Sequence, residues 1–283
     1  MQELVHPLQA LLDARYADAA PKIADFNTGA ESVDAALAVL LQHRSARAYL
    51  QRPVEQPVLD LMMAAAQSAS TSSNLQAWSV VAVRDPERKK RLAALAGGQR
   101  HIEQCPVFLI WIADLARLEA AGVRHNLPRG GLDFMELMLV GVIDATLAAQ
   151  NAAVAGEAQG LGVVYIGGIR NKPEAVAEEL GLPSRAFAVF GMCVGYPDPE
   201  RPSDVKPRLP TSVVLHEERY DAAHNEQPVE DYAARMLSFY QAQGMKTNGD
   251  WVQHSLHRVR GAESLQGRDR LVEALKGMGF ENR

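Results

Sequence analysis

The stretch from Phe134 to Gln159 constrains the fold most, because its spacing predicts one long helix that is apolar on nearly every side. A helix of this kind is buried, and its many alanines let a second helix approach closely. Asp144 lies within the stretch, and Glu136 and Glu157 lie near its ends, so a bilayer-spanning helix is disfavoured. Two interpretations stay open, a core helix and a helix that forms a dimer interface.

The composition is that of a soluble globular protein that acts on small molecules. The 283 residues can bury a large core, as one domain or as a domain with extensions. The net charge is −5 and no long Lys/Arg run occurs, which disfavours nucleic acid and anionic membranes as partners. Cys105 and Cys193 lie among apolar residues, so we expect buried thiols and no disulfide framework. The first residues show no signal peptide, which predicts a cytoplasmic location.

Apolar periodicity and turn residues predict an alternation of helices and strands. A helical extension is expected over residues 1–32, with a turn at 27–29. A β-rich run at 105–113 is expected to be a central strand, and a Gly/Pro loop is expected at 122–131. Further strands are predicted at 78–83, 162–166 and 186–194. Further helices are predicted at 33–42, 56–68, 87–95, 173–180, 229–241 and 250–260.

The motif His43-Arg44-Ser45-Ala46-Arg47 places two guanidiniums, an imidazole and a hydroxyl where a helix gives way to an extended segment. Pro53 supports the extended segment, because proline disfavours helix for the residue before it. Arg44 and Arg47 therefore emerge together near an element boundary, where forked N–H donors can hold a phosphate. Taken alone, the motif fits an anion site and a solvated basic turn equally well.

Two further motifs are compatible with a flat, anionic ligand. Lys206 and Arg208 lie in a proline-stiffened segment, where residues two apart aim their side chains to the same side. Such a pair binds phosphate at little cost in ordering entropy, although a solvated basic loop fits as well. Gly167 and Gly168 end a predicted strand and let backbone amides approach a ligand, while an ordinary turn is the simpler interpretation.

Taken in order, five motifs resemble the FMN-dependent nitroreductase family, most closely its NADPH-type nitroreductase and flavin reductase branch. The resemblance covers about residues 33–220. It implies an α+β fold with a central mixed sheet wrapped by helices, in an intertwined homodimer that forms its flavin sites at the interface. Residues 33–283 would then be one FMN-binding domain with a C-terminal wrapping segment. The motifs are His43–Arg47, Thr71–Gln76, Gly97–Gln99, Gly162–Gly168 and Lys206–Pro210.

The resemblance also implies which residues bind the cofactor. Arg47 would lie near the pyrimidine edge of the flavin, where a cation favours the anionic reduced ring. The FMN phosphate and ribityl chain would be held by His43, Arg44, Ser45, Lys206 and Arg208. The ring or the phosphate would receive hydrogen bonds, from either chain, from Gln99, Ser72, Ser73, Asn74 and Gln76. Backbone amides would reach the ring from Tyr165, Ile166, Gly167 and Gly168.

The implied activity is hydride transfer from NADPH or NADH to FMN, followed by electron transfer to nitroaromatics, quinones or flavins in a ping-pong reaction. FMN carries the redox chemistry, so no catalytic side chain and no metal site is predicted. Residues 241–248 contain a single cation, Lys246, where the branch tends to place arginines that bind the 2′-phosphate of NADPH. Two alternatives stay open: a flavin or quinone reductase without nitro activity, and a non-catalytic flavin-binding protein.

Overall fold

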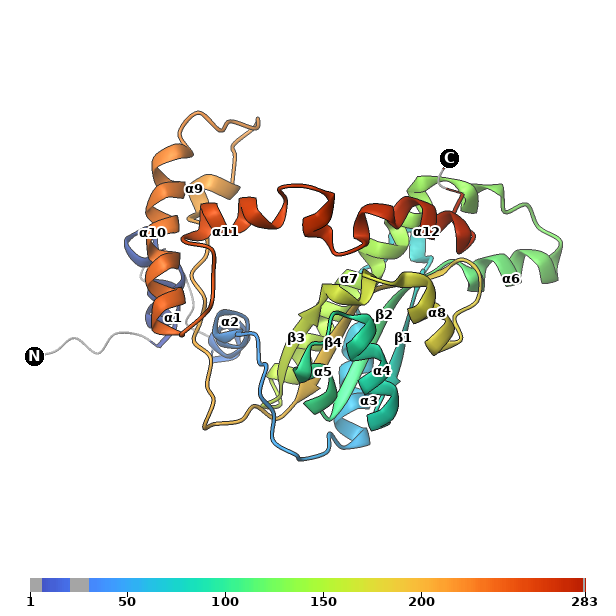
Figure 1. Cartoon of the computed structure of the whole chain (residues 1–283), viewed down its shortest axis with the longest axis horizontal. Helices are drawn as coiled ribbons and strands as arrows, with labels where there is room; N and C mark the ends of the chain where they lie inside the picture. The colour runs from blue at the N-terminus through green and yellow to red at the C-terminus, as the bar shows by residue number, and fades with distance from the viewer. Residues whose placement is uncertain (1–6, 21–30, 282) are drawn as a thin grey trace, which may run out of the picture. The chain divides into compact units, whose positions relative to one another are not determined.

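Four strands form one sheet in the computed structural model, which describes residues 7–20, 31–281 and 283 (Figure 1). The spatial order is β1-β2-β4-β3, and every neighbouring pair of strands is antiparallel. An isolated parallel bridge, outside the four strands, joins Ser45 to Val163 at the outer edge of β3. The strands are β1 (Trp78–Val83), β2 (Val107–Asp114), β3 (Gly162–Ile166) and β4 (Ala186–Gly195).

The chain divides into two compact units. The sheet unit comprises residues 45–202 and 265–283, and the helical unit comprises the described residues within 1–44 and 203–264. Each unit is built from two chain segments that are far apart in sequence. The basic motif at 43–47 therefore contributes its first two residues to the helical unit and its last three to the sheet unit.

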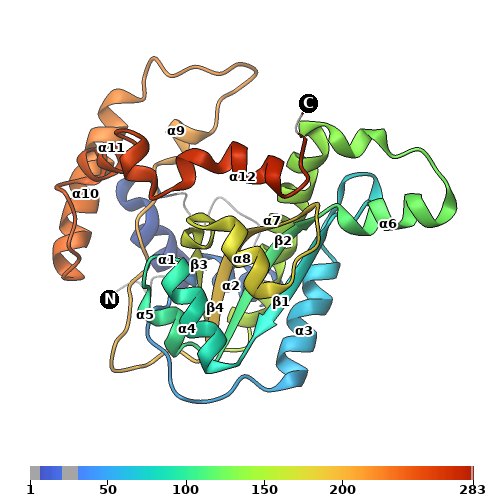
Figure 2. The same ribbon diagram turned by 45° about the vertical axis from the view of Figure 1, so that its right-hand side comes forward.

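Helices cover both faces of the sheet in the sheet unit (Figure 2). Strand β2 shows why, because its side chains alternate between two hydrophobic clusters. Leu109 and Trp111 pack with helices on one face, and Phe108 and Ile110 pack with helices on the other. One face carries α3 (Gln56–Gln67) and α7 (Met135–Glu157), and the other carries α4 (Pro86–Leu95), α5 (Arg100–Gln104) and α8 (Pro173–Leu180).

Helix α7 has one side buried in the core and another that carries exposed apolar residues. Its alanines at 145, 148, 149, 152 and 153 are fully buried against the sheet and α3, which confirms the core interpretation. Four large apolar residues at intervals of four remain between 41% and 53% exposed in the single chain, namely Met135, Leu139, Ile143 and Leu147. Residues four apart lie on one side of a helix, so they form a continuous apolar stripe.

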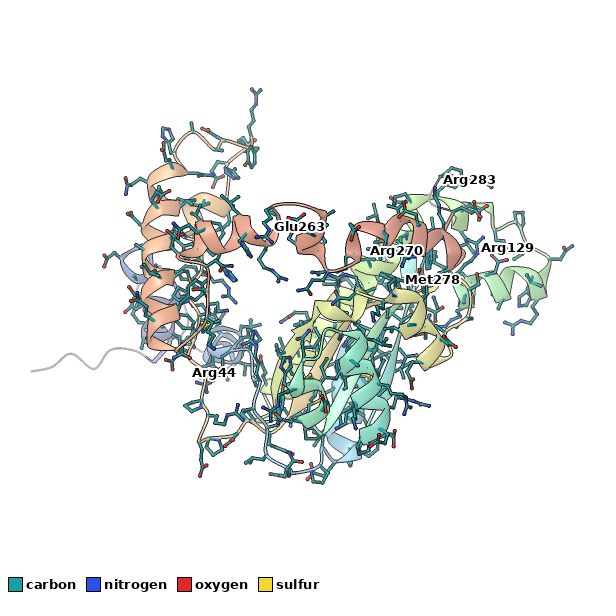
Figure 3. The ribbon with its side chains drawn as sticks, viewed as in Figure 1. Arg44, Arg129, Glu263, Arg270, Met278 and Arg283 are labelled. Atoms are coloured by element: carbon teal, nitrogen blue, oxygen red, sulfur yellow. The ribbon has the colours of Figure 1, made fainter. Side chains whose placement is uncertain are left out.

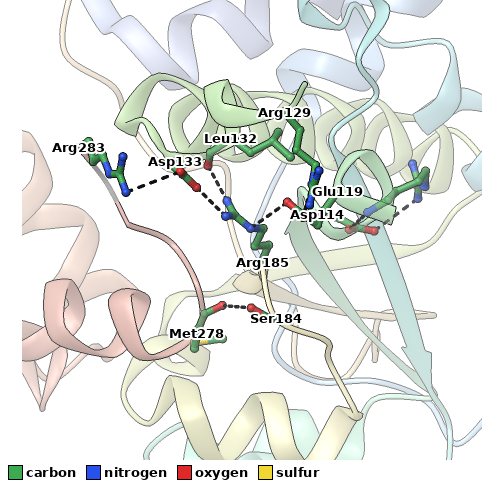
Figure 4. A network of polar contacts seen from close by, with 10 residues as sticks. Asp114, Glu119, Arg129, Leu132, Asp133, Ser184, Arg185, Met278 and Arg283 are labelled. Atoms are coloured by element: carbon green, nitrogen blue, oxygen red, sulfur yellow. Dashed lines mark hydrogen bonds and ion pairs between the residues drawn. The ribbon is translucent and has the colours of Figure 1, made fainter. Parts of the chain in front are cut away.

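A network of charged groups fixes the C-terminal residue to the start of α7 (Figure 4). The Arg185 guanidinium lies 2.6 Å from the Asp133 carboxylate and 3.3 Å from that of Glu119, and it also donates to the Leu132 carbonyl. The backbone N–H of Arg283 donates to the Asp133 carbonyl over 3.0 Å. The Arg185 side chain lowers the pKa of Asp133 below its usual value through their hydrogen bond, so the carboxylate is charged at neutral pH.

The helical unit is a small bundle with its own core. Tyr232, Met236 and Tyr240 are buried on one side of α10, and the Tyr232 ring meets Trp251 edge to face at 5.3 Å. Helix α11 begins with a capping box between Asp250 and Gln253. The helices are α1 (Pro7–Tyr16), α2 (Glu31–Gln42), α9 (Thr211–Val214), α10 (Glu226–Ala242) and α11 (Trp251–Arg258).

Most predicted elements are confirmed, and one is wrong. The loop expected at 122–131 begins as helix, because α6 spans Ala116–His125. Gly122 lies inside that helix, where Arg129 packs so closely that a Cβ would lie 2.9 Å from its Cδ. Helices α5 and α12 (Leu271–Gly277) were not predicted, and the turn expected at 27–29 lies outside the described residues. The short 3-10 helices are η1 (Ala17–Ala19), η3 (Ser72–Asn74), η4 (Gly130–Asp133), η5 (Gly167–Arg170), η6 (Ala262–Leu265) and η7 (Arg268–Arg270).

The substitution Gly191→Ala tests the packing of the sheet. A Cβ on Gly191 would overlap the ring of the fully buried Phe108, and overpacking of this kind costs about 1–3 kcal/mol. Urea unfolding of Gly191→Ala should show that loss. The matched control is Gly130→Ala, because a Cβ at Gly130 meets nothing within 4 Å. Equal stability of the two variants would contradict the packing described for β2 and β4.

Candidate functional site

The basic motif leaves α2 and joins the outer edge of the sheet. His43 and Arg44 follow the last residue of α2, and Figure 3 shows Arg44 where the chain leaves that helix. Ser45 then pairs with Val163, and the N–H of Ala46 donates to the Val163 carbonyl over 2.9 Å. The predicted change from helix to extended chain is therefore confirmed. Arg44 and Arg47 are both exposed, with the buried Ala46 between them.

The outer edge of β3 presents backbone groups toward the end of the strand. The Val163 carbonyl points to the segment at 45–46, and backbone groups two residues apart in a strand point to the same edge. The N–H and C=O of Tyr165 therefore face outward as well. The side chains of Tyr165 and Ile166 pack with the clusters on opposite faces of the sheet. The outer edge of this strand end thus consists of backbone groups, and their contact with a flavin stays a prediction.

Gln99 and Gly168 lie against each other at the end of β3. Gln99 precedes α5 and donates from Nε2 to the Ala96 carbonyl over 3.0 Å. A Cβ on Gly168 would lie 2.7 Å from Gln99 Nε2 and would overlap the same carbonyl. Glycine is therefore required at residue 168. The structure brings together two residues that the resemblance assigned to the flavin ring from motifs about 70 positions apart.

His101 is a residue of this cluster that sequence reasoning missed. It lies in α5, two positions after Gln99, and its buried Nε2 has no hydrogen-bond partner in the described part of the chain. Burial, and then the positive charge of Arg47, lower the pKa of His101 below its usual value, so the imidazole is neutral at pH 7. A buried polar atom without a partner costs about 1–3 kcal/mol, and a water or a ligand can supply that partner.

The loop at 71–77 is held by a single buried carboxylate, that of Asp144 on α7. Thr71 Oγ1 donates to Asp144 Oδ2 over 2.6 Å, and the N–H groups of Ser72 and Ala77 donate to Oδ1 and Oδ2 over 3.2 and 3.0 Å. Asp144 is only 1% exposed. These bonds fix both ends of the loop to the core helix. Sequence reasoning missed this role, although a lone acidic residue in an apolar helix is the signal that could have found it.

Between those anchors the loop adopts a strained backbone and exposes its polar side chains. Ser73, Asn74 and Gln76 have φ angles of 47°, 55° and 48°, in the left-handed region that non-glycine residues rarely occupy. Their side chains and that of Ser72 are exposed. Strain of this kind persists only where the surrounding contacts impose it, and it is concentrated at functional sites. The loop is therefore a rigid, polar surface suited to a ligand.

Lys206 and Arg208 belong to the helical unit, in a segment without helix or strand. Lys206 is half-buried and Arg208 is exposed. Tyr232 donates from its hydroxyl to the Pro207 carbonyl over 3.3 Å, which fixes the segment to α10. Arg208 Nη1 makes two long contacts with the carbonyls of Lys206 and Pro207, at 3.4 and 3.3 Å. Guanidinium carries five N–H donors, so these weak contacts leave most of its capacity for an anion.

The comparisons with known proteins agree with this arrangement. Residues 40–196 match the sequence model of the nitroreductase family, and residues 206–283 match that of the nitroreductase family, C-terminal domain. The oxygen-insensitive NADPH nitroreductase of Salmonella typhimurium is 36% identical over 87% of this chain and 98% of its own. The FMN reductase (NADPH) of Bacillus subtilis is 35% identical over 85% of this chain and 96% of its own.

A solved structure shows the same fold. The NADPH:FMN oxidoreductase from Vibrio harveyi, complexed with NAD+, superposes with a TM-score of 0.78 at 34% identity, over 88% of this chain and 100% of the other. The α+β fold is therefore shared with an enzyme of this class. The chain belongs to the nitroreductase family. The family matches leave residues 1–39 and 197–205 uncovered, so α1 lies outside them.

The substitution Asp144→Asn tests the anchoring of the loop. Ser72 and Ala77 donate to different oxygens of Asp144, so an asparagine would turn its NH2 group toward one of these N–H donors. A buried donor left without an acceptor costs about 1–3 kcal/mol, and urea unfolding should show a loss of that size. Asp60→Asn is the control, because Asp60 is exposed and accepts one bond from Gln56 that an amide can keep. A change in Asp144→Asn no larger than in the control would refute the anchoring role.

Proposed function

We propose that this chain is an FMN-dependent NAD(P)H oxidoreductase that works as a homodimer. The observation that carries the proposal is the end of β3, where Gln99 lies against Gly168 beside an outward-facing strand backbone, with His101 two positions after Gln99 in the chain. These groups fit a flat heterocycle with hydrogen-bonding edges. Gly168 leaves room for a ring to approach the backbone, and His101 Nε2 offers a buried polar atom that needs a partner.

The relatives supply the identity of the cofactor and of the electron donor. Their names specify FMN and NADPH, and the Vibrio harveyi enzyme was solved with NAD+. When bound, FMN supplies the two-electron chemistry that links the nicotinamide to the electron acceptor. The residues of this chain bind and orient it. We assign the phosphate to His43, Arg44, Ser45, Lys206 and Arg208, and the ring to Arg47 and the backbone of 165–168. Gln99 and the loop at 72–76 are assigned to the ring or the phosphate, from either chain.

Electrostatics explain why a cation belongs near the ring. Arg47 lies close enough to His101 to lower the pKa of its imidazole, and burial acts in the same direction. His101 therefore stays neutral, and Arg47 provides the positive charge of this cluster. A positive charge beside a ring that gains electrons stabilises the negative charge that develops there. The neutral imidazole can hold a hydrogen bond without adding a second charge.

The proposal also covers the electron acceptor and the choice between NADPH and NADH as electron donor. We propose nitroaromatics, quinones and free flavins as acceptors, in a cytoplasmic enzyme. Lys246 is the only cation in residues 241–248, so a single ammonium is available there for the 2′-phosphate of NADPH. The proposal is consequently that the enzyme uses both NADPH and NADH.

Anaerobic titration of the FMN-loaded protein tests this function. Both NADPH and NADH should bleach the visible flavin absorbance, and a nitroaromatic, menadione or free FMN should then restore it. Initial rates with the three acceptors separate a nitroreductase from a flavin or quinone reductase. Flavin that binds but is not bleached by either nicotinamide would favour a non-catalytic flavin-binding protein. A protein that takes up no FMN would refute the proposal entirely.

The apolar stripe on α7 supports the homodimer. Met135, Leu139, Ile143 and Leu147 are exposed in the single chain, and a contiguous apolar surface of this kind is typical of an interface. Asp144, which follows Ile143 on the same helix and points into the core, holds the loop at 71–77. A second copy that covers the stripe would therefore bind the same helix that holds the loop proposed to bind the flavin.

The substitution Ile143→Glu tests the role of the stripe. A carboxylate buried without a partner in the interface should raise the dimer dissociation constant by roughly 100-fold or more. Sedimentation velocity over a range of concentrations measures this, with Ile143→Leu as the control that keeps the apolar contact. A dimer of unchanged stability in Ile143→Glu would show that α7 does not form the interface.

A further inference from the structure

Arg15 joins the two segments that carry the proposed phosphate-binding residues of the helical unit. It lies on α1, outside the residues matched by the nitroreductase family models. Its side chain is among the few charged ones that are buried, with 5% exposure. A guanidinium is buried only where its donors find acceptors, and Arg15 finds them at the end of α2.

The guanidinium caps the end of α2. Its Nε donates to the Leu41 carbonyl and its Nη2 to the His43 carbonyl, both over 3.0 Å. The last carbonyls of a helix have no partner within the helix, and a cation there also interacts favourably with the helix dipole. The chain direction after α2 is thereby fixed from outside the helix. His43 and Arg44, the first residues of the basic motif, leave α2 from this capped end.

The backbone of Arg15 holds the second segment. Its carbonyl accepts a hydrogen bond from the Arg208 N–H over 3.0 Å and another from Arg235 Nη2 over 3.1 Å. Arg235 lies on α10, the helix that also fixes Pro207 through Tyr232. One residue of α1 thus contacts the backbone at His43 and at Arg208, which are 165 positions apart in the chain.

We propose that Arg15 is a positioning residue that sets the spacing between the two arms of the phosphate site, one at His43 and Arg44 and the other at Lys206 and Arg208. The inference rests on the proposed function, because that function assigns these side chains to the FMN phosphate. Arg15 itself does not touch the phosphate. It reduces the freedom that the cationic side chains lose on binding, so the site is ordered before the cofactor arrives. The N-terminal helix α1 is on this account a part of the cofactor site.

The experiment compares two ligands that differ only in the phosphate. Apoprotein is titrated with FMN and with riboflavin, and flavin fluorescence gives both dissociation constants. Arg15→Met keeps the length and the apolar stem of the side chain but removes its donors. The FMN dissociation constant should rise about tenfold, as expected for the loss of charge-assisted hydrogen bonds, while the riboflavin constant changes by less than about twofold.

Two further variants complete the design. Arg15→Lys offers a compact ammonium in place of a fork, so its FMN affinity should fall between those of the wild type and Arg15→Met. Arg15→Lys alone tests the positioning role if Arg15→Met does not fold. Asp13→Ala is the matched control, because Asp13 is exposed on α1 and accepts a hydrogen bond from the neighbouring Gln9. Its affinities for both ligands should equal those of the wild type.

The outcomes separate this inference from the proposed function. Unchanged FMN affinity in Arg15→Met and Arg15→Lys would overturn the positioning role. An equal loss of FMN and riboflavin would also overturn it, because Arg15 would then support the fold and not the phosphate site. Wild-type protein that binds riboflavin as tightly as FMN would refute the phosphate assignment itself, and with it the inference. Loss confined to FMN, with Arg208→Ala showing the same selectivity, supports both.

Discussion

The packing of α7 against the sheet is the constraint on which the rest of the sheet unit depends. Its alanines and glycines allow a close approach, and a Cβ on Gly141 would lie 3.1 Å from the Cβ of Ala113 and 3.3 Å from the Ala77 carbonyl. Such contact places the buried Asp144 carboxylate within reach of the chain at 71–77. The same close packing turns an apolar stripe outward, where a second copy is proposed to bind.

Taken separately, the two units carry different kinds of residues that are proposed to bind the cofactor. In the sheet unit, the chain at the end of β3 has little side-chain volume, because Gly168 lies against Gln99. The neutral imidazole of His101 follows two positions after Gln99 in the chain. The helical unit offers cations whose backbone is fixed, at His43 and Arg208. A strand end of this kind suits a flat aromatic ring, and cations on a fixed backbone suit a phosphate.

Local sequence signals were sufficient for most of the secondary structure. The strands Trp78–Val83 and Gly162–Ile166 were predicted to the residue, because turn residues or glycines bound each apolar run. Helix α6 was missed, since Gly122 was taken as a loop residue when its role is to admit the side chain of Arg129. Propensity describes one residue and its neighbours, and it cannot register a contact from elsewhere in the chain.

The same difference between local signals and long-range contacts decides which site residues could be predicted. Motif order was enough to nominate Gln99 and Gly168, and the structure brings them together. Asp144 and Arg15 were not nominated as site residues, because their roles arise from contacts 73 and 28 positions away that only the folded chain creates. His101 was missed for a related reason, since an unpartnered ring nitrogen is a property of burial and not of sequence. Residues that act through long-range contacts are thus harder to predict from sequence than the residues that the motifs nominate.

The most direct measurement is a crystal structure of the protein grown with FMN. The account predicts two chains related by a twofold axis through the α7 stripe, with the phosphate hydrogen-bonded to Arg44 and Arg208. It also predicts the flavin ring against the backbone of Gly168, within hydrogen-bond distance of Gln99. A flavin bound elsewhere, or a phosphate held by other residues, would contradict the central claim.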